Sequence, residues 1–223
     1  MIKLIAFDWN GTLLADTICS WEGSSKQLEF CGKKPMSLLK FRQTFAFPYS
    51  ECLVANGVRR EFILKNSGKI AKTFFDFYEQ RAVKCRTRSG VREVLSWLKK
   101  NHIGSMIYSN HTLLGIEAQL KRLKIKNYIE IVLAHSDQAG GLHNKNKGQK
   151  LLSYIKSNNF KPHEVISVGD TAEEIEIGKQ YGFYTVGITG GYNTAAKLKM
   201  HHPDYLIHNM GDLIDIIKKI NQS

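Results

Sequence analysis

Short apolar runs recur along the chain and alternate with amphipathic segments. Runs of the length typical of buried strands cover residues 2–7, 105–108, 129–133, 165–168 and 184–188, and a weaker run covers residues 205–207. Between them, the segments 89–101, 112–123, 148–158 and 211–220 place apolar residues at helical spacing. Strands that alternate with such helices are typical of an α/β fold, so we expect a parallel sheet with helices on both faces.

One stretch, residues 16–85, breaks this alternation and contains no convincing buried strand. Two of its segments, PMSLLKFRQTFAF and GKIAKTFFDFYEQRAV, are helix-like and rich in phenylalanine. The simplest interpretation is a mainly helical insertion after the first strand. We therefore expect two units, an α/β core formed by residues 1–15 and 86–223 and a helical unit formed by residues 16–85.

The composition narrows the class of protein. The chain has 223 residues, of which 43% are apolar and 23% are charged, as in an ordinary folded protein. The sequence contains no run of 18 apolar residues and no basic stretch followed by an apolar one. We therefore expect no membrane span, no secretory leader and a cytoplasmic location. The four cysteines form no C-x-x-C pair and no zinc pattern, which favours reduced thiols.

The net charge of +12 attracts anions such as phosphorylated metabolites, nucleic acid or acidic membranes. The basic residues are spread along the chain rather than gathered in one tail. This distribution disfavours a nucleic-acid partner. The partner that we expect is a small phosphorylated metabolite, and the oligomeric state stays open.

Polar side chains cluster where the predicted strands end. They are Asp8, Asn10, Gly11 and Thr12 after the first strand, Ser109 and Asn110 after the second, Lys145 and Lys147 ahead of the fourth, and Asp170 and Glu174 after it. Ligands of parallel α/β sheets bind beyond the carboxyl ends of the strands, so we expect these side chains to meet at one edge. Crowded carboxylates need a cation, and oxygen ligands favour Mg²⁺, which often bridges to a phosphate. A lysine and a serine beside the metal would stabilise a phosphoryl group, which predicts a phosphoryl-transfer site.

Four of these segments together resemble the signature motifs of the haloacid dehalogenase superfamily. They are DWNGTL, IYSN, a lysine ahead of a helix, and VGDTAEEIE. They occur in the family's order between residues 7 and 174, and the later strands resemble the rest of its Rossmann-like core. The helical stretch 16–85 resembles the cap that phosphoglycolate-phosphatase-like members carry between the first two motifs.

The resemblance implies a role for each matching residue. Asp8 matches the nucleophile that becomes an aspartyl phosphate, and Ser109 matches the residue that hydrogen-bonds the transferring phosphoryl group. Lys147 matches the lysine that pairs with both the nucleophile and the phosphate. It is preferred to Lys145 because it lies at the start of the following helix, whose N-terminal dipole favours an anion. Further phosphate-binding groups are expected on Gly11, Thr12 and Asn110.

For a metal ion, the resemblance implies Mg²⁺ held by Asp8, the backbone carbonyl of Asn10, Asp170 and Glu174. Glu174 stands where an aspartate is commoner, so its contact with the metal is expected to be direct or through water. The neighbouring Glu173 is expected to be a solvated helix residue. The GGYNT segment at residues 190–194 is expected to be a flexible turn.

Asn10 stands where most phosphatases of this family carry a second aspartate, the general acid for the leaving group. An amide has no titratable proton near neutral pH, so a proton transfer typically worth about 10²–10⁴-fold is lost. Slow turnover of alkyl phosphates and tolerance of good leaving groups such as aryl phosphates are expected. His111 is an alternative acid, because histidine titrates near neutral pH. The preferred interpretation, however, is that His111 only begins a helix and takes no part in catalysis.

The sequence therefore predicts a Mg²⁺-dependent phosphohydrolase that acts on a small phosphorylated metabolite through an aspartyl phosphate on Asp8. One alternative is an enzyme that forms this intermediate and releases it slowly. Another is a weak or inactive protein that binds phosphate and Mg²⁺ and serves as a regulatory or interaction protein, because Asn10 replaces the general acid. A nucleic-acid-directed phosphatase is suggested only by the charge.

Overall fold

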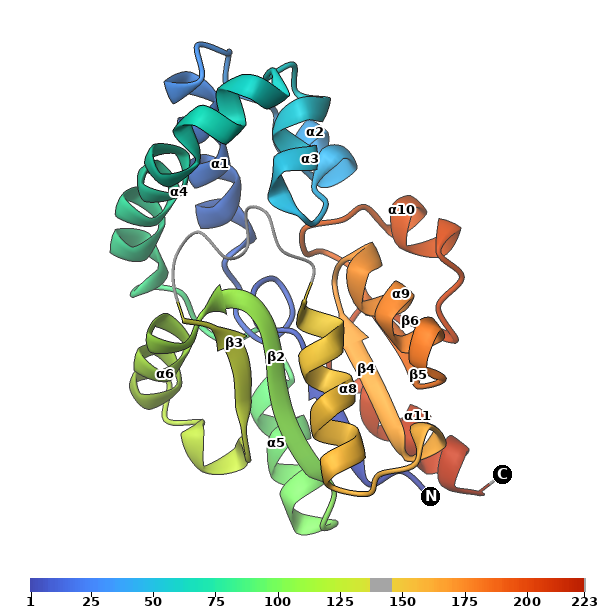
Figure 1. Cartoon of the computed structure of the whole chain (residues 1–223). Helices are drawn as coiled ribbons and strands as arrows, with labels where there is room; N and C mark the ends of the chain where they lie inside the picture. The colour runs from blue at the N-terminus through green and yellow to red at the C-terminus, as the bar shows by residue number, and fades with distance from the viewer. Residues whose placement is uncertain (137–145, 223) are drawn as a thin grey trace.

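The computed structural model describes residues 1–136 and 146–222 and contains a six-stranded sheet in the order β3-β2-β1-β4-β5-β6. The strands are β1 (Leu4–Phe7), β2 (Gly104–Thr112), β3 (Val132–His135), β4 (Val165–Gly169), β5 (Tyr184–Ile188) and β6 (Tyr205–Ile207). Every neighbouring pair is parallel. The predicted parallel α/β sheet is confirmed, and its Rossmann-like order reverses between β1 and β4 (Figure 1).

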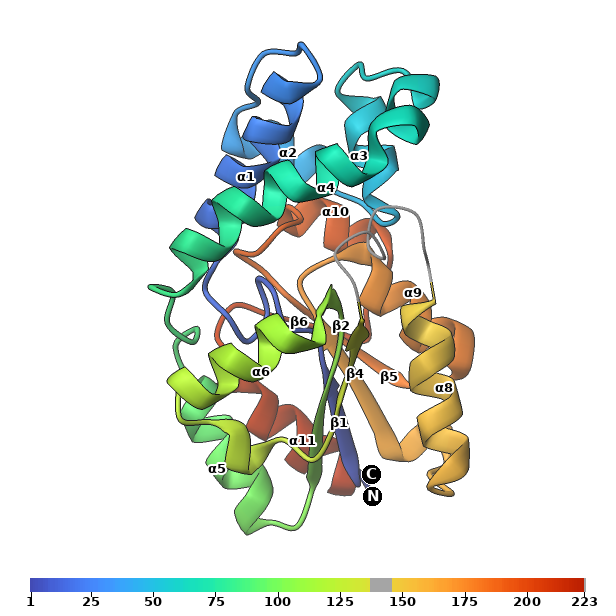
Figure 2. The ribbon, with the colours of Figure 1, turned by 60° about the vertical axis from the view of Figure 1, so that its left-hand side comes forward.

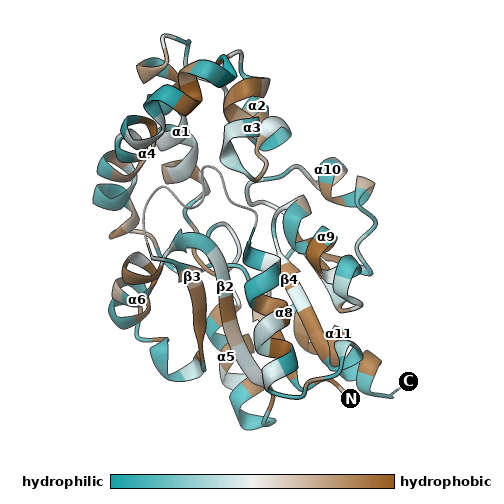
Figure 3. Cartoon of the chain, in the orientation of Figure 1, coloured by the Kyte–Doolittle hydropathy of each residue, from teal (hydrophilic) through white to brown (hydrophobic). Residues whose placement is uncertain are grey.

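Helices cover both faces of this sheet, as predicted (Figures 1 and 2). They are α5 (Val91–Lys100), α6 (Leu113–Arg122), α8 (Lys147–Ser157), α9 (Ala172–Tyr181), α10 (Ala195–Met200) and α11 (Asp212–Gln222), with short 3₁₀ turns η1 (Lys126–Tyr128) and η2 (Pro162–Glu164). Alternation along β1 defines the two faces. Ile5 and Phe7 pack with α5, α6 and α11, whereas Leu4 and Ala6 pack with α8 and α9. Figure 3 shows the apolar residues concentrated in the strands and on the sides of the helices that face them.

Three strands differ from the sequence prediction by two residues or more, and β1 begins at Leu4 rather than at residue 2. β2 continues beyond Tyr108 through the polar residues 109–112, with a register irregularity against β3 between Tyr108 and Thr112. β3 begins at Val132 rather than at residue 129, although the backbone at Glu130 and Ile131 already bonds to β2. The extension of β2 carries the polar residues 109–112 to the carboxyl edge of the sheet, where the predicted site lies.

Between β1 and α5 the chain forms four helices, as expected for this stretch. They are α1 (Thr17–Phe30), α2 (Leu38–Thr44), α3 (Tyr49–Ala55) and α4 (Arg60–Ala82). The structure describes every residue from 16 to 85, and none of them lies in a strand. The four helices enclose a second apolar cluster that includes Leu28, Phe41 and Leu53 and is joined by Tyr192 from the segment after β5. They lie beyond the carboxyl ends of the strands (Figure 1). The division into two units at residues 16 and 85 stays a prediction.

Within the described ranges 1–136 and 146–222, no helix has both the length and the apolar character needed to cross a bilayer.

Helix α9 approaches the sheet closely at Gly178. A Cβ atom on Gly178 would stand 2.4 Å from Thr185 Cγ2 on β5 and 3.3 Å from Ser167 Cβ on β4. Neither neighbour is the free end of a long side chain, so a larger residue would push the helix off the sheet. Because α9 begins two residues after Asp170, its seating on the sheet also fixes the acidic segment that follows β4.

Replacing Gly178 with valine is expected to lower the free energy of unfolding by about 1–3 kcal/mol, because overpacking strains a well-filled interior. Urea denaturation followed by circular dichroism measures the change. Gly68→Ala on the exposed side of α4 is the control, since a Cβ there meets nothing within 4 Å. It is expected to stabilise by up to about 1 kcal/mol. Equal losses in the two variants would contradict the close approach of α9.

Candidate active site

The turn that follows β1 brings Asp8 to the carboxyl edge of the sheet. Its backbone N–H donates to the Val168 carbonyl of β4 at 2.9 Å, and its side chain is buried. Gly11 has a φ of +74°, and a Cβ there would stand 2.2 Å from Asp170 Oδ2. Only glycine therefore lets this turn pass the Asp170 carboxylate.

Lys147 is the first residue of α8, and its side chain reaches the same edge of the sheet as Asp8. Its Nζ lies 2.7 Å from Asp8 Oδ1 and also donates to Glu174 Oε1, and it stands 4.6 Å from the centre of the Tyr108 ring. Burial lowers the pKa of the Lys147 ammonium, but the charges of Asp8 and Glu174 outweigh burial and hold that pKa well above its usual value. Lys147 is therefore a permanent cation enclosed by acidic groups.

Asp170 lies on the other side of the β1 turn and is fully buried. Its Oδ1 accepts a hydrogen bond from Thr12 Oγ1 at 2.7 Å, and its Oδ2 accepts from the Tyr192 backbone N–H at 2.6 Å. Burial and then the charge of Glu174 raise the pKa of Asp170 to about 7. Burial also raises the pKa of Asp8, with repulsion from Glu174 and Asp170 acting against the attraction of Lys147. The site thus holds more negative charge than its ammonium offsets.

Glu174 is engaged by protein groups at both oxygens. Its Oε2 accepts from the Thr171 N–H at 3.1 Å and from Thr171 Oγ1 at 2.6 Å, while its Oε1 accepts from Lys147. The expectation that Glu173 is solvated is wrong. Glu173 is buried, accepts from Asn110 Nδ2 at 2.6 Å and lies 3.7 Å from Lys147 Nζ. The first turn of α9 faces these polar partners at the sheet edge rather than solvent.

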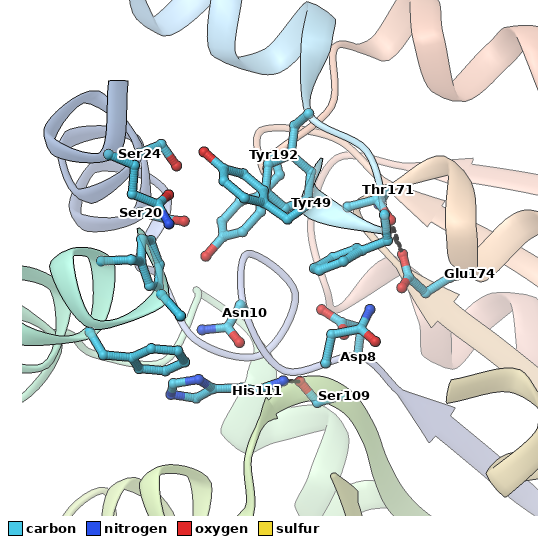
Figure 4. Close-up of a pocket in the computed structure, with 17 residues that line it drawn as sticks. Asp8, Asn10, Ser20, Ser24, Tyr49, Ser109, His111, Thr171, Glu174 and Tyr192 are labelled. Carbon is cyan, nitrogen blue, oxygen red and sulfur yellow. Dashed lines mark hydrogen bonds between the residues drawn. The ribbon is translucent and has the colours of Figure 1, made fainter. Parts of the chain in front are cut away.

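The extension of β2 presents Ser109 and His111 beyond the sheet. Ser109 Oγ accepts from the His111 backbone N–H at 3.2 Å (Figure 4). The His111 ring stacks on Phe75 of α4 with ring centres 5.5 Å apart, and its Nε2 lies 3.3 Å from Glu79 Oε1 on the same helix. The imidazole nitrogen Nε2 is therefore directed at the helical insertion.

Asn10 is held by a buried carboxylate, Asp16, which the sequence analysis did not single out. Asp16 accepts from Asn10 Nδ2 at 2.7 Å, Gly11 N–H at 2.7 Å, Tyr78 OH at 2.6 Å and Tyr192 OH at 2.8 Å. Asn10 Nδ2 also donates to Tyr78 OH at 2.7 Å. A carboxylate only accepts, so the amide nitrogen must face Asp16 and Oδ1 must face away. The Gly11 N–H, expected on phosphate, is occupied by Asp16.

The segment 190–194 is not the flexible turn that the sequence suggests. The Tyr192 ring packs edge-on against Phe45 of the insertion with ring centres 4.7 Å apart, and Asn193 Nδ2 donates to the Phe45 carbonyl at 3.0 Å. A Cβ on Gly191 would stand 2.1 Å from Asp170 Oδ2. Gly191 lets the backbone of this segment lie against the Asp170 side chain. No local pattern in the sequence predicts this contact.

A pocket of about 760 Å³, its open mouth included, lies between the sheet edge and the helical insertion. The core lines it with Asp8, Asn10, Ser109, Asn110, Thr171 and Glu174. The insertion lines it with polar and aromatic residues that include Ser24, Gln27, Phe45, Tyr49, Phe74 and Phe75. In Figure 4, Ser24 and Tyr49 lie across the pocket from Asp8 and Ser109.

The structure brings nearly all the predicted site residues to this region. Lys147 contacts Asp8 on the pocket lining, and Asp170 stands close enough to Asp8 to raise its pKa. Thr12 bonds to Asp170, so it supports a carboxylate directly. The alternative lysine, Lys145, lies outside the described residues. Asp16, Tyr78 and Tyr192 are the additions that sequence reasoning missed.

Comparisons with known proteins agree with this geometry. A phosphoglycolate phosphatase of Pseudomonas aeruginosa is 22% identical over 216 residues, which cover 95% of this chain and 78% of that protein. The pyrophosphatase PpaX of Bacillus mycoides is 28% identical over 131 residues, 59% of this chain and 60% of that protein. A haloacid dehalogenase-like hydrolase from Streptococcus pneumoniae has the same fold, with a TM-score of 0.80 at 17% identity over 97% of this chain and 98% of that one.

The predicted enzyme class, a phosphoric monoester hydrolase, agrees with the names of these relatives. The sequence profile of the haloacid dehalogenase-like hydrolases matches residues 5–188, which include all four motifs. The chain therefore belongs to the haloacid dehalogenase-like hydrolase family.

Proposed function

We propose that the chain is a Mg²⁺-dependent phosphohydrolase that transfers the phosphoryl group of a small phosphorylated metabolite to Asp8 and then to water. The observation that carries the proposal is the buried pair of Asp8 and Lys147, 2.7 Å apart, against a pocket that also presents Ser109 and Asn110. A carboxylate nucleophile beside a fixed cation and hydrogen-bonding side chains suits phosphoryl transfer. The phosphatase and pyrophosphatase names of the relatives support the same reaction class.

In the proposed reaction, Lys147 pairs with Oδ1 of Asp8 and leaves Oδ2 for attack. A bond forms between Oδ2 and phosphorus as the bond between phosphorus and the leaving oxygen breaks. Water then attacks the phosphorus of the aspartyl phosphate, which releases inorganic phosphate and restores Asp8. The Lys147 ammonium and the Ser109 hydroxyl offset charge on the phosphoryl oxygens during both steps.

The charge balance of the site fits a divalent cation. Four carboxylates, those of Asp8, Asp170, Glu173 and Glu174, are buried near the ammonium of Lys147, and the Arg88 guanidinium acts on Asp170 as a second cation. Burial and mutual repulsion raise the pKa of Asp8 and Asp170, which shows the cost of this crowding. A bound cation would offset that cost.

The identity and placement of the donors suit Mg²⁺. No group of three Asp, Glu, His or Cys side chains in the described part of the chain forms a complete metal cage. Mg²⁺ does not need one, because it keeps several waters and binds through one or two carboxylates. We assign Asp8, Asp170 and the Asn10 carbonyl as its ligands, with Glu174 acting through water because both its oxygens are engaged. When bound, the ion would neutralise charge on the phosphoryl oxygens.

The helical stretch 16–85 is proposed to act as a cap over the site. Arg42 of α2 donates to the Gly191 carbonyl at 2.9 Å and to the Gly190 carbonyl at 3.0 Å. Lys197 Nζ of α10 donates to the Phe45 carbonyl at 2.7 Å. These contacts between insertion and core support a closed arrangement that excludes water from the reacting groups.

Asn10 supports a second candidate function, a phosphate-binding protein with little or no turnover. Its Nδ2 is fixed on Asp16 and Tyr78, so the side chain has neither a proton nor a free donor to offer a leaving group. Burial and then the charge of Asp16 raise the pKa of Tyr78 well above its usual value, so that phenol is a poor acid as well. Turnover on a good leaving group separates the two candidates.

Asp8→Asn is expected to lower Mg²⁺-dependent hydrolysis of an aryl phosphate by at least about a thousandfold, because it removes the nucleophile. The measurement is the initial rate of phenol release with and without Mg²⁺. Asp215→Asn makes the same chemical change on an exposed side chain and is expected to leave the rate unchanged. Equal residual rates in wild type and Asp8→Asn would reject the enzyme and leave the phosphate-binding protein.

The stability of the metal-free protein is expected to fall as the pH rises from about 4 through about 7. Asp170 holds its proton in the folded state up to about pH 7, whereas the unfolded chain releases it near its ordinary pKa of 3.8. The stabilisation from this proton is complete below pH 3.8 and is lost as pH passes 7. Urea midpoints of chelator-treated wild type and Asp170→Asn at pH 5 and pH 8 measure the effect.

The wild type is expected to lose more stability than Asp170→Asn over this interval, and Mg²⁺ is expected to restore the wild type at pH 8 only. Parallel pH profiles of the two proteins would show that Asp170 carries no such proton.

Asn10→Asp is expected to raise turnover of an alkyl phosphate by about tenfold or more, within the 10²–10⁴-fold that a general acid typically supplies. The new carboxyl would take the place of an amide nitrogen 2.7 Å from Asp16 Oδ2, and two carboxylates this close share a proton. Asn110→Asp, which places a carboxyl against Glu173, is the matched control and is expected to give no gain. Steady-state rates that do not rise in Asn10→Asp would mean that the missing acid does not limit turnover.

A further inference from the structure

Three buried polar atoms on the insertion side of the pocket form no hydrogen bond of normal geometry within the described part of the chain, although the hydroxyls of Ser24 and Tyr49 are near enough to interact with each other. They are Ser24 Oγ, Gln27 Oε1 and Tyr49 OH, and all three residues line the pocket. The exposed fractions of Ser24, Gln27 and Tyr49 are 0%, 3% and 8%. Buried polar atoms are normally paired, so a cluster of unpaired ones on a pocket wall indicates that a ligand completes them.

The geometry fixes what these atoms offer. Gln27 Nε2 donates to the Ile70 carbonyl at 3.0 Å. Because a carbonyl only accepts, Gln27 cannot flip, and its Oε1 is a fixed acceptor. The hydroxyls of Ser24 and Tyr49 can either donate or accept. The set is uncharged, and Figure 4 shows Ser24 and Tyr49 on the side of the pocket opposite Asp8.

Aromatic side chains form the adjoining walls. Phe45 and Phe47 pack edge-on with ring centres 5.2 Å apart, and Phe74 and Phe75 do so at 5.4 Å. All four line the pocket. They provide apolar surface beside the three unpaired atoms, which suits a ligand with apolar faces and a few hydrogen-bonding groups.

The described residues of this half of the pocket carry no positive charge. Among the residues that the structure describes, neither a lysine nor an arginine lines it. Arg42 is bound to the Gly190 and Gly191 carbonyls, and Arg60 to Glu51. The Asp16 carboxylate is buried behind Asn10. An anionic group entering here would lose its water without gaining a cationic partner.

We infer that this pocket selects a phosphate monoester whose alcohol or phenol part is neutral, apolar on its faces, and bears a hydroxyl or amide group remote from the phosphate. The inference rests on the proposed function and specifies its substrate class. Ser24, Gln27 and Tyr49 are the specificity-determining residues. Phosphoglycolate carries a carboxylate in this place and pyrophosphate a second phosphate, so neither compound matches the subsite.

Three aryl phosphates with leaving groups that need no general acid test the inference: 4-carbamoylphenyl, 4-carboxyphenyl and phenyl phosphate. We expect kcat/KM to be highest for the carbamoyl ester and at least about tenfold lower for the carboxy ester. Competitive inhibition of phenyl phosphate hydrolysis by 4-hydroxybenzamide and 4-hydroxybenzoate is expected to give the same order without involving a leaving group. Equal or better use of the carboxy ester, with the matching order of inhibition, would overturn the inference.

Variants that lack the hydroxyls of Ser24 and Tyr49 test whether these residues cause the preference for the carbamoyl ester. Ser24→Ala combined with Tyr49→Phe is expected to lower the kcat/KM ratio of carbamoyl to phenyl ester about fivefold or more. The melting temperature is expected to change little, because the double change removes both hydroxyls of the Ser24–Tyr49 contact and leaves neither one behind without the other. Tyr154→Phe on α8, outside the pocket, is the control and is expected to keep the ratio. An unchanged ratio in the double variant would overturn the assignment of these residues.

The two levels of the proposal fail in different ways. If none of the three esters is hydrolysed in an Asp8-dependent manner, the phosphohydrolase itself is rejected. If hydrolysis depends on Asp8 but favours the carboxy ester, the reaction stands and only the neutral substrate class is rejected.

Discussion

The crowding of buried carboxylates around Lys147 is the constraint on which the rest of the site depends. Asp8, Glu173 and Glu174 all lie within ion-pair distance of a single ammonium, and Asp170 adds a fourth negative charge nearby. Such an arrangement is costly to bury, and it persists only because the surrounding fold holds each group in place. The close seating of α9 on the sheet and the glycines beside Asp170 serve this purpose. The proposed cation would offset this unbalanced charge.

Much of this arrangement is visible in the sequence because it follows from local pattern and one rule of topology. Apolar runs mark the strands, and the residues directly after them, such as Asp8 and Asp170, must meet at one edge of a parallel sheet. The contacts of Asp16 could not be predicted in this way. Tyr78 lies 62 residues further along the chain and meets Asp16 because α4 packs on α1, whereas Tyr192 lies 176 residues away and meets it only where the insertion contacts the core. The burial of Glu173 could not be predicted either, because a charged residue in a first helical turn is usually solvated.

The pocket combines two regions of opposite character. The core side is charged and tightly paired, as at Asp8 and Lys147, whereas the insertion side is neutral and leaves hydroxyls such as those of Ser24 and Tyr49 unpaired. The first region carries the family motifs, all of which lie within the matched residues 5–188. The second depends on residues of the stretch 16–85, which contains none of the four motifs. A family assignment therefore identifies the reaction before it identifies the compound.

The hydrogen bond from the Gly11 N–H to Asp16 also protects the chemical integrity of the chain. Asn-Gly pairs deamidate when the glycine nitrogen attacks the asparagine side-chain carbonyl to form a succinimide. In the folded protein this nitrogen donates to Asp16 Oδ1 at 2.7 Å, and the Asn10 amide is tied to Asp16 and Tyr78. Cyclisation would require both sets of bonds to break. We therefore expect Asn10 to convert to aspartate or isoaspartate more slowly in the folded protein than in the unfolded chain.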